Sequence, residues 1–375
     1  MACIRHAYKS SAKYLERQRR LKILFLTRYD RLGSSSRLRC LQFLPWFEQG
    51  GIQYEVRPFI SDEMLHAKYV SGSYGIFALA LAYLDRFKAL LSSRNFDLVW
   101  IEKESLPWLP AFIERFFLRK VRYVLDYDDA QFHNYDLHTF FIIRKLLGAK
   151  IQQLVARARL VVVGNPYLRD WVLSHGAINV ETIPTVIDLT RYCFTREKSF
   201  SSQFPTVVWI GSPSTVRYLN EIAPALVSLS KSYKFKLRVI GAKINIAGVE
   251  IEALDWNEAT EVADIAECDV GVMPLQDSPW ERGKCGYKLI QYMACGLPVI
   301  ASPVGVNTQI VKDGLNGYLA TNTDEWLARL SQLLANIELR KQFGQAGRQM
   351  VESEYCVQKV GPRLTQLLTA AGASR

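Results

Sequence analysis

The amino-acid sequence predicts an α/β protein in which two doubly wound domains face a central cleft. Short apolar segments alternate with amphipathic helical patterns, which is typical of parallel sheets covered by helices on both faces. The alternation pauses in a polar stretch at about 186–205 and then resumes. The chain of 375 residues is long enough for two domains of ordinary size.

The first half of the chain carries six candidate strands separated by helical patterns. The strands are expected at 21–26, 52–59, 97–101, 121–125, 160–163 and 180–183. One helix is expected at about 37–48. A long amphipathic helix is expected at about 76–94, because Phe77, Leu84 and Leu91 recur there at helical spacing.

The second half repeats the alternation and ends in helices. Strands are expected at 207–210, 237–240, 269–274 and 297–301. Helices are expected at 216–231, 284–294, 323–335, 338–352 and 356–371. The predicted parts are a basic extension at 1–20, a first domain at 21–190, a linker at 191–205, a second domain at 206–354 and a final helix at 355–375. That final helix can pack back on the first domain.

Composition narrows the class of protein. The chain is 49% hydrophobic and 22% charged, and its net charge of +11 favours an anionic partner such as nucleotide phosphates, an acidic lipid surface or an acidic glycan. Motifs of nucleic-acid-binding proteins are absent. The seven cysteines include no C-x-x-C pair, so neither a zinc site nor a disulfide framework is expected. Without an apolar leader or an apolar run of about 18 residues, a cytoplasmic protein is predicted.

Two basic segments leave a membrane contact open. Residues 1–20 are rich in cations and are compatible with a frayed extension or with an arm that touches a membrane. A second segment mixes aromatic side chains with cations. It contains Trp108, Phe112, Phe116 and Phe117 close to Arg115, Arg119, Lys120 and Arg122. These aromatics fit either a peripheral membrane interface or a core stripe with solvated charges opposite.

The segment from Arg282 to Ser302 is the most informative motif, since it reads as a loop, a helix and a buried strand. On a helix at 284–294, Lys284, Lys288 and Gln291 fall on one face. Two lysines beside a helix N-terminus, whose free N–H groups favour anions, suit a diphosphate. The alternative is a surface helix with solvated lysines.

The same segment resembles the donor-binding motif of retaining glycosyltransferases with the GT-B fold, chiefly glycosyltransferase family 4 of the "glycosyl transferases group 1" type. In that family a glutamate, seven residues and a second glutamate precede Met-Ala-x-Gly-x-Pro-Val-Ile, and the second glutamate usually holds the ribose hydroxyls. Here Gln291 stands at the second position and Gly283 at the first, with Glu281 two residues earlier. The resemblance implies two Rossmann-like domains, with the acceptor domain at 21–190 and the nucleotide-sugar donor domain at 206–354. The two departures leave the donor-sugar contacts open.

Two further loops follow the first strand of each predicted domain. Gly33-Ser-Ser-Ser-Arg37 and Gly211-Ser-Pro-Ser-Thr215 can each offer hydroxyls and backbone N–H groups to an anion, or can cap a helix. In the second loop, Arg217 is the nearby cation. The resemblance extends to both loops and to the segment 304–307. The predicted donor-binding residues are Gly33, Ser34, Gly211, Ser212, Ser214, Gly283, Gly286, Tyr287, Gln291, Gly305 and Val306.

The segment Asp126-Tyr-Asp128-Asp129 ends a strand and has two interpretations. An Asp-x-Asp pair holds manganese on the nucleotide in GT-A transferases, and carboxylates suit such hard ions. Because the chain shows two domains and carries cations for the diphosphate, we expect no metal and place these aspartates on the acceptor side. The predicted catalytic residues are Lys288, Lys284, Arg217, Asp128 and His133. The predicted acceptor-side residues are Ser36, Arg37 and Asp129.

The resulting hypothesis is a cytoplasmic glycosyltransferase that moves a sugar from a UDP- or GDP-linked donor to a hydroxyl acceptor. The resemblance implies retention of configuration and a role in surface glycan or glycoconjugate biosynthesis. The expected partners are the nucleotide sugar, a glycan, lipid-linked or small-molecule acceptor and an anionic membrane surface, without nucleic acid or a cofactor. Two alternatives stay open: a nucleotide-sugar epimerase of the same fold, and a non-catalytic glycan-binding or scaffold subunit.

Overall fold

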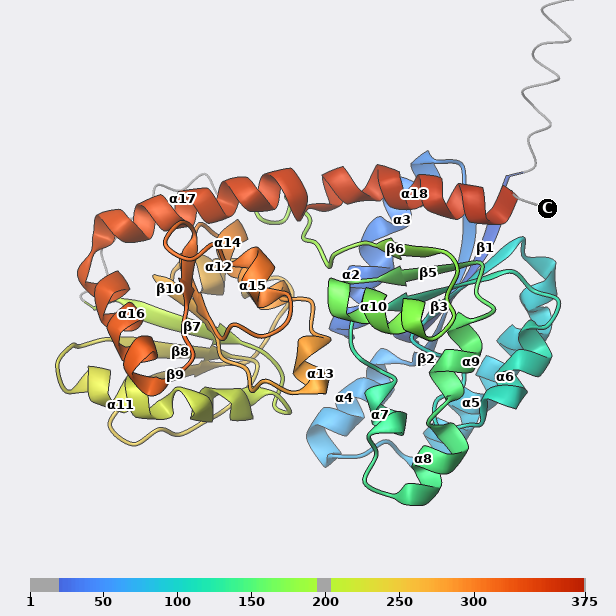
Figure 1. The fold of residues 1–375 in the computed structure, drawn as a ribbon, viewed down its shortest axis with the longest axis horizontal. Coiled ribbons are helices and arrows are strands. Elements are labelled where there is room, and N and C mark those ends of the chain that lie inside the picture. The colour runs from blue at the N-terminus through green and yellow to red at the C-terminus, as the bar shows by residue number, and fades with distance from the viewer. Residues whose placement is uncertain (1–19, 194–203, 374–375) are drawn as a thin grey trace, which may run out of the picture.

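The structure is a computed structural model that describes residues 20–193 and 204–373 (Figure 1). Each half of the chain forms one six-stranded parallel sheet with helices on both faces. The predicted fold class is therefore confirmed. The predicted extension at 1–20 and the predicted linker at 191–205 lie mostly outside the described residues.

The first sheet has the strand order β2-β1-β3-β4-β5-β6. Its strands are β1 Lys22–Tyr29, β2 Gln53–Ile60, β3 Leu98–Glu102, β4 Tyr123–Tyr127, β5 Leu160–Val163 and β6 Val180–Thr182. The helices around it are α2 Ser34–Arg39, η1 Leu41–Phe43, α3 Leu44–Gln49, α4 Asp62–Ser71, α5 Ile76–Ser92, η2 Ser93–Asn95, α6 Ala111–Leu118, α7 His133–Asp136, α8 Phe141–Leu147, α9 Lys150–Val155 and α10 Pro166–Ser174. All six predicted strands are present within a few residues of their expected positions.

The second sheet has the strand order β12-β11-β10-β7-β8-β9. Its strands are β7 Thr206–Ile210, β8 Lys236–Ile240, β9 Glu250–Leu254, β10 Val270–Met273, β11 Val299–Ala301 and β12 Gly317–Leu319. Its helices are η3 Val216–Glu221, α11 Ala223–Ser230, α12 Glu261–Ala266, α13 Pro279–Arg282, α14 Tyr287–Ala294, α15 Asn307–Ile310, α16 Thr323–Ala335 and α17 Ile337–Glu354. The last helix is α18 Val357–Ala373.

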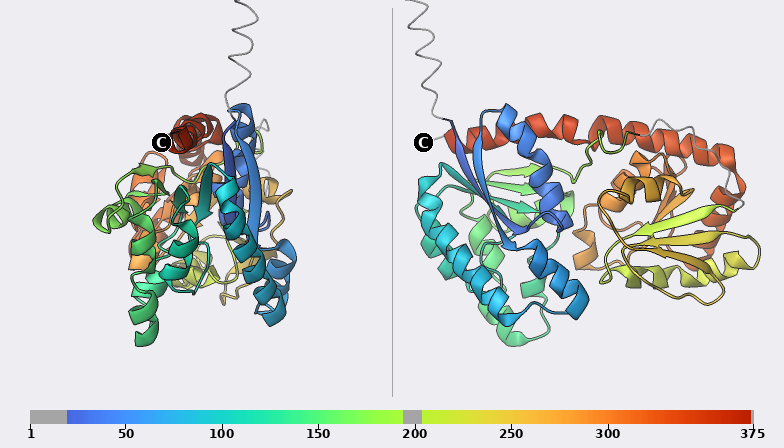
Figure 2. Two further views of the ribbon diagram at one scale, coloured as in Figure 1. Left: turned by 90° about the vertical axis from the view of Figure 1, so that its right-hand side faces the viewer. Right: turned by 180° about the vertical axis from the view of Figure 1, so that it is seen from behind.

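Each sheet buries an apolar cluster on both of its faces. The strands read as continuous apolar runs, such as Leu160–Val163, because parallel strands are covered on two sides. In the second domain one face packs on α12, α14 and α17 and the other on α11 and α16. The helix α18 crosses back and packs against α3 and η1 of the first domain, so the final helices run along both domains (Figure 2).

Several predicted helices begin later or break earlier than expected. The helix expected at 37–48 is divided into α2, η1 and α3, because Pro45 lacks an N–H group and can only begin a new helix. Likewise, the helix expected at 216–231 becomes η3 and α11, with Pro224 in the first turn of α11. The edge strands β9 and β12 were not predicted, since β9 alternates charged with apolar residues and β12 has three residues.

Candidate functional site

The two sheets face each other at the carboxyl ends of their strands. Within each sheet, the order in which the chain adds strands reverses at one point, between β1 and β3 in the first sheet and between β7 and β10 in the second. Ligands of doubly wound sheets bind at such points. Contacts join the two walls directly: the Cys285 thiol donates to the carbonyl of Asp128 at 3.0 Å, and the Arg37 guanidinium lies 4.7 Å from the ring centroid of Trp256.

The second-domain wall is built around the start of α14. Gly286 precedes this helix with φ of 66°, a left-handed conformation that glycine adopts without strain. The expected helix at 284–294 therefore begins only at Tyr287, and Lys284 lies in the loop before it, while Lys288 occupies the first turn. The first backbone bond of the helix runs from the N–H of Leu289 to the carbonyl of Gly286, so the amides before it precede the helical ladder.

The predicted cations gather over aromatic rings on this wall. The guanidinium of Arg217 and the ammonium of Lys284 lie 5.4 Å and 6.0 Å from the ring centroid of Tyr218. The ammonium of Lys288 lies 5.0 Å from the ring of Trp209. Arg217 is exposed, whereas both lysines are partly buried. Cations from η3, from the loop before α14 and from the first turn of α14 are thus brought to the same end of the second sheet.

Lys288 has the most perturbed charge of the three. Burial and, to a lesser extent, the neighbouring charge of Lys284 lower its pKa to about 7, while Asp129 on the opposite wall acts in the other direction. Asp129 of the first domain interacts electrostatically with both lysines, so the lysines lie on the side of the cleft that faces the first domain. An anion bound here would favour the charged form of Lys288.

The position of Gly283 explains one departure from the family motif. A Cβ atom at residue 283 would lie 2.6 Å from the Cβ of Ala130 in the first domain, so a glutamate does not fit in this arrangement. The nearby Glu281 is buried and accepts hydrogen bonds from the hydroxyls of Tyr218 and Ser278. These bonds hold the pKa of Glu281 below its ordinary value against the effect of burial. Glu281 therefore shapes the loop that carries Lys284.

Gln291 stands at the second departure, and it is buried inside the second domain. Its amide nitrogen donates to the hydroxyl of Tyr192 at 2.9 Å. Tyr287 is partly buried against the same core. Gly305 lies close to the carbonyl of Arg282, and Val306 is buried beside Gly286. The motif thus lies on α14 and the loops beside it, and the amide nitrogen of Gln291 is bonded within the protein to Tyr192.

The loop after β7 is held by bonds among its own hydroxyls. Ser212 and Ser214 bond each other at 2.9 Å, and Thr215 donates to the carbonyl of Ser212 at 3.0 Å. Thr215 occupies the N-cap position of η3, as the capping alternative has it, but its side chain makes no capping bond. Gly211 connects the loop to the sheet through its N–H and the carbonyl of Ile240.

The first-domain wall is a network of charged side chains at the ends of β3 and β4. The Ser35 hydroxyl lies 2.6 Å from a carboxylate oxygen of Glu102 and 2.7 Å from one of Asp128. The Lys103 ammonium lies 3.1 Å from Asp128 and 3.5 Å from Asp129. Lys103 has φ of 62°, a strained conformation for a residue with a side chain, and such strain is common at functional sites.

The carboxylates of this wall differ in their surroundings. Burial would raise the pKa of Asp128, but Lys103 and Arg39 outweigh this effect and keep it below its ordinary value. Burial raises the pKa of Asp129, and Lys103 opposes the rise while Asp128 adds to it. Asp126 forms a bidentate pair with Arg39 at 2.5 Å and 3.0 Å. Because Arg39 and Lys103 already neutralise these aspartates, the geometry does not favour the Asp-x-Asp metal interpretation.

The other predicted first-domain residues take several positions. Ser36 is buried, accepts from the N–H of Tyr29 and donates to Glu102 at 2.5 Å. Gly33 is buried under Tyr29, and Ser34 is exposed. Gly33 is the N-cap residue of α2 and Ser34 begins the helix, so the alternative in which a serine caps this helix is not the arrangement found.

Arg37 and His133 have partners that the sequence did not suggest. Arg37 is buried and turns toward Trp256 of the second domain rather than toward the acceptor wall. His133 has both ring nitrogens bonded, one to Asp136 at 2.8 Å and one to the hydroxyl of Tyr167 at 2.7 Å. Of the predicted first-domain residues, Asp128 and Asp129 are therefore the two that pair with Lys103, and Ser36 joins the same network through Glu102.

Sequence reasoning missed several residues that shape the cleft. Ser35, Glu102 and Lys103 complete the first-domain network. Asn165 donates to the carbonyls of Gly283 and Lys284 at 2.7 Å and 3.0 Å and thereby ties the lysine loop to the first domain. A charged run directly after the buried strand at 97–101 was an available signal, because strand ends at this edge form the site.

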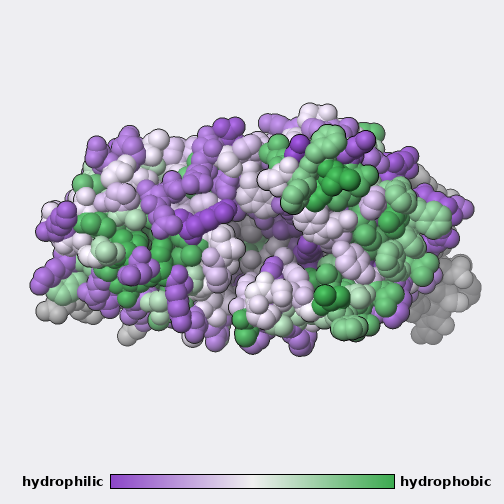
Figure 3. All heavy atoms as spheres, turned by 90° about the horizontal axis from the view of Figure 1, so that it is seen from below, coloured by the Kyte–Doolittle hydropathy of each residue, from purple (hydrophilic) through white to green (hydrophobic). Residues whose placement is uncertain are grey.

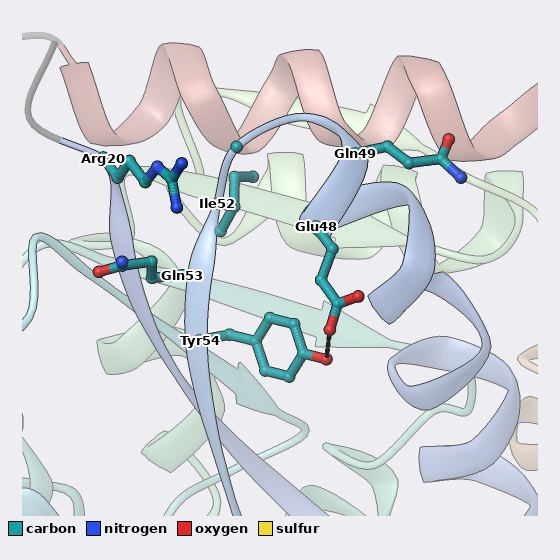
Figure 4. Close-up of a pocket in the computed structure, with 7 residues that line it drawn as sticks. Arg20, Glu48, Gln49, Ile52, Gln53 and Tyr54 are labelled. Carbon is teal, nitrogen blue, oxygen red and sulfur yellow. Dashed lines mark hydrogen bonds between the residues drawn. The ribbon is translucent and has the colours of Figure 1, made fainter. Parts of the chain in front are cut away.

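A separate hollow lies at the amino ends of the strands of the first sheet, away from the cleft. Figure 4 shows it bordered by Arg20, Glu48, Gln49, Ile52, Gln53 and Tyr54. The Tyr54 hydroxyl donates to Glu48 at 2.5 Å. Gln53 begins β2, so this hollow is at the amino ends of the strands and is remote from the cleft.

Two doubly wound domains with facing carboxyl edges define the GT-B fold. Solved structures support this assignment. Sucrose-phosphate synthase from Thermosynechococcus elongatus matches 95% of this chain and 100% of its own, with a TM-score of 0.71 and 15% identity. Anabaena HepE in complex with UDP-glucose matches 93% of this chain and 100% of its own, with a TM-score of 0.70 and 16% identity. These low identities establish the fold alone.

A family model matches the second domain, and relatives match part of the chain. Residues 204–336 match the family model described as "Glycosyl transferases group 1". An uncharacterized glycosyltransferase from Methanocaldococcus jannaschii is 33% identical over 141 residues, which are 36% of this chain and 38% of the relative. The alpha-maltose-1-phosphate synthase of Mycolicibacterium smegmatis is 27% identical over 164 residues, 42% of this chain and 38% of the relative. The chain thus matches well under half the length of each relative.

Proposed function

We propose that this protein is a glycosyltransferase that moves a sugar from a UDP- or GDP-linked donor to a hydroxyl acceptor. The observation that carries the proposal is the gathering of Arg217, Lys284 and Lys288 at the start of α14, opposite the network of Asp128 and Lys103. The match of residues 204–336 to a glycosyltransferase family model adds support, as do the UDP and UDP-glucose bound by HepE.

In the proposed reaction, the bond between the anomeric carbon and the diphosphate breaks while a bond to the acceptor oxygen forms. The cations and the amides before α14 would stabilise the negative charge that develops on the departing diphosphate. A donor phosphate oxygen would take the acceptor proton on the same face of the sugar, which gives retention of configuration. Asp128 and Asp129 would bind acceptor hydroxyls, and no metal or other cofactor is needed for charge neutralisation.

The proposed biological setting is the cytoplasm, with surface glycans or glycoconjugates as products. The test is a panel of UDP- and GDP-sugars, in which we expect release of the free nucleotide diphosphate, stimulated by an acceptor and insensitive to a chelator. Mass spectrometry of the acceptor product would identify the sugar. The double variant Lys284→Ala/Lys288→Ala should lose turnover, whereas the exposed lysine pair variant Lys231→Ala/Lys234→Ala is the control.

The main rival is a non-catalytic glycan-binding subunit. It is favoured by the internal bond of Gln291 to Tyr192 and by the absence of a side chain at residue 283. Donor binding without turnover over the whole panel would support this rival and contradict the transferase. A change of the donor sugar without any acceptor would instead indicate a nucleotide-sugar epimerase.

A further inference from the structure

The first domain exposes an unusual number of large apolar side chains on α5, α6 and the segment 137–146. Phe77 on α5 is 88% exposed, Phe112 and Phe116 on α6 are 68% and 56% exposed, and Phe141 and Ile142 on α8 are 67% and 65% exposed. Figure 3 shows apolar surface gathered over the first domain on the face seen from below. The start of α5 and all of α8 reach this end of the domain (Figures 1 and 2).

The aromatic cluster noted in the sequence divides between core and surface. Phe117 is partly buried and packs against Phe87 of α5 with ring centroids 5.7 Å apart. Trp108, Phe112 and Phe116 remain exposed. The cluster is therefore not simply a core stripe, because one member anchors α6 on α5 while the others face outward.

The charges beside these rings are positive. The Arg119 guanidinium lies 4.4 Å from the ring centroid of Phe116, and that of Arg144 lies 5.8 Å from Phe141. Lys120 and Lys145 are exposed next to them. The acidic residues of these helices are already neutralised: Glu114 is buried against Lys150, and the exposed Asp85 of α5 pairs with Lys88 at 2.8 Å.

We propose that this apolar and basic face docks on an anionic lipid surface. Exposed rings flanked by cations match the two components of such a surface, the apolar chain boundary and the anionic headgroups. A second copy of the chain would instead place like charges opposite one another. No helix within 20–193 or 204–373 is long and apolar enough to cross a bilayer, so the contact would be peripheral. The inference stands on this face alone and does not depend on the transferase proposal.

The test is co-sedimentation of the full chain with vesicles at physiological salt. Vesicles of phosphatidylcholine mixed with phosphatidylglycerol should bind the protein, and vesicles of phosphatidylcholine alone should bind it much more weakly. Two variants separate the components: Phe77→Ser/Phe116→Ser/Phe141→Ser removes rings, and Arg119→Gln/Lys120→Gln/Lys145→Gln removes charges. We expect each to weaken partitioning by about tenfold or more, since both components contribute.

A matched control removes exposed apolar side chains from other elements. Ile178, Leu315 and Ile337 are 91%, 60% and 44% exposed, and their combined change to serine should leave vesicle binding intact. Equal thermal melting of all variants would exclude unfolding as the cause. The proposal is overturned if the unaltered chain does not bind anionic vesicles, or if the control variant loses as much vesicle binding as the ring variant. It is also overturned if the only effect of the ring variant is to dissociate a dimer.

Discussion

The lowered pKa of Lys288 makes donor binding dependent on pH. The lysine has a pKa of about 7 in the free protein, because burial and Lys284 disfavour its charge. A bound diphosphate needs the charged form and would raise this pKa again. Binding should therefore take up a proton whenever the pH lies between the free and bound pKa values.

The size of the effect follows from the fraction of charged lysine. With the pKa at about 7, about one molecule in eleven carries the charge at about pH 8 and about one in a hundred at about pH 9. Donor affinity should thus be greatest at and below neutral pH and fall by up to about tenfold for each pH unit above 7. The dependence ends where the pH exceeds the pKa of the bound form.

Isothermal titration calorimetry measures both parts of this prediction. The probe is the nucleotide sugar that binds best in the donor panel, since its diphosphate has no group that titrates near neutral pH. Titrations in two buffers with different ionisation heats should report proton uptake above neutral pH. Lys288→Arg should bind with a flat pH profile because a guanidinium stays charged, and Lys284→Ala should move the midpoint upward by removing a like charge.

Two results would refute this reasoning. The first is a donor affinity that stays constant across the alkaline range without proton uptake. The second is an unchanged slope in Lys288→Arg, which would place the titrating proton on another group.

Three further predictions concern the walls of the cleft. Gly283→Glu should lower the free energy of unfolding by about 1–3 kcal/mol through overpacking. Gly75→Glu should not, because a Cβ at residue 75 would meet only the Cβ of Ala78, at an ordinary contact distance of 4.0 Å; thermal melting compares the two variants. Removing Arg39 alone by Arg39→Met should cost about 3–5 kcal/mol in urea unfolding, because the buried Asp126 loses its partner, and adding Asp126→Leu should recover much of the loss. Ser35→Ala should reduce turnover by roughly tenfold, and the donor affinity measured by calorimetry should stay unchanged. A weakened donor affinity would contradict the assignment of Ser35 to the acceptor wall.

The sequence predicts the fold well because parallel sheets leave a strong apolar signal. Strands such as Leu160–Val163 are buried on both faces, so their composition alone identifies them. The prediction fails where burial is partial, as in the charged edge strand β9, and where a backbone detail decides, as at Gly286. Helix periodicity placed Lys284 on a helix that in fact begins three residues later, since the left-handed φ of Gly286 has no periodic signature.

The candidate site was predictable on one wall and less so on the other. The lysines and Arg217 follow a local motif that a sequence shows directly. In the network of Ser35, Glu102 and Lys103, the serine comes from α2, which follows β1, and the other two residues come from the end of β3; β1 and β3 are distant in sequence and become neighbours only in the folded sheet. Pairings of this kind depend on register, and no local pattern encodes the partner of a single serine or glutamate.

The contacts between the two domains lie beside Lys288, the lysine whose pKa is lowered. Asn165 and the carbonyl of Asp128 hold residues 283–285 against the first domain, and this places Lys284 and Lys288 in a confined space near Asp129. Without a ligand, burial and Lys284 disfavour the charge of Lys288 in this space, and Asp129 offsets only part of the effect. A diphosphate bound between the walls would instead favour the charged form of Lys288. Donor binding and domain closure should then stabilise each other, since the ligand has a different affinity for the open and closed arrangements.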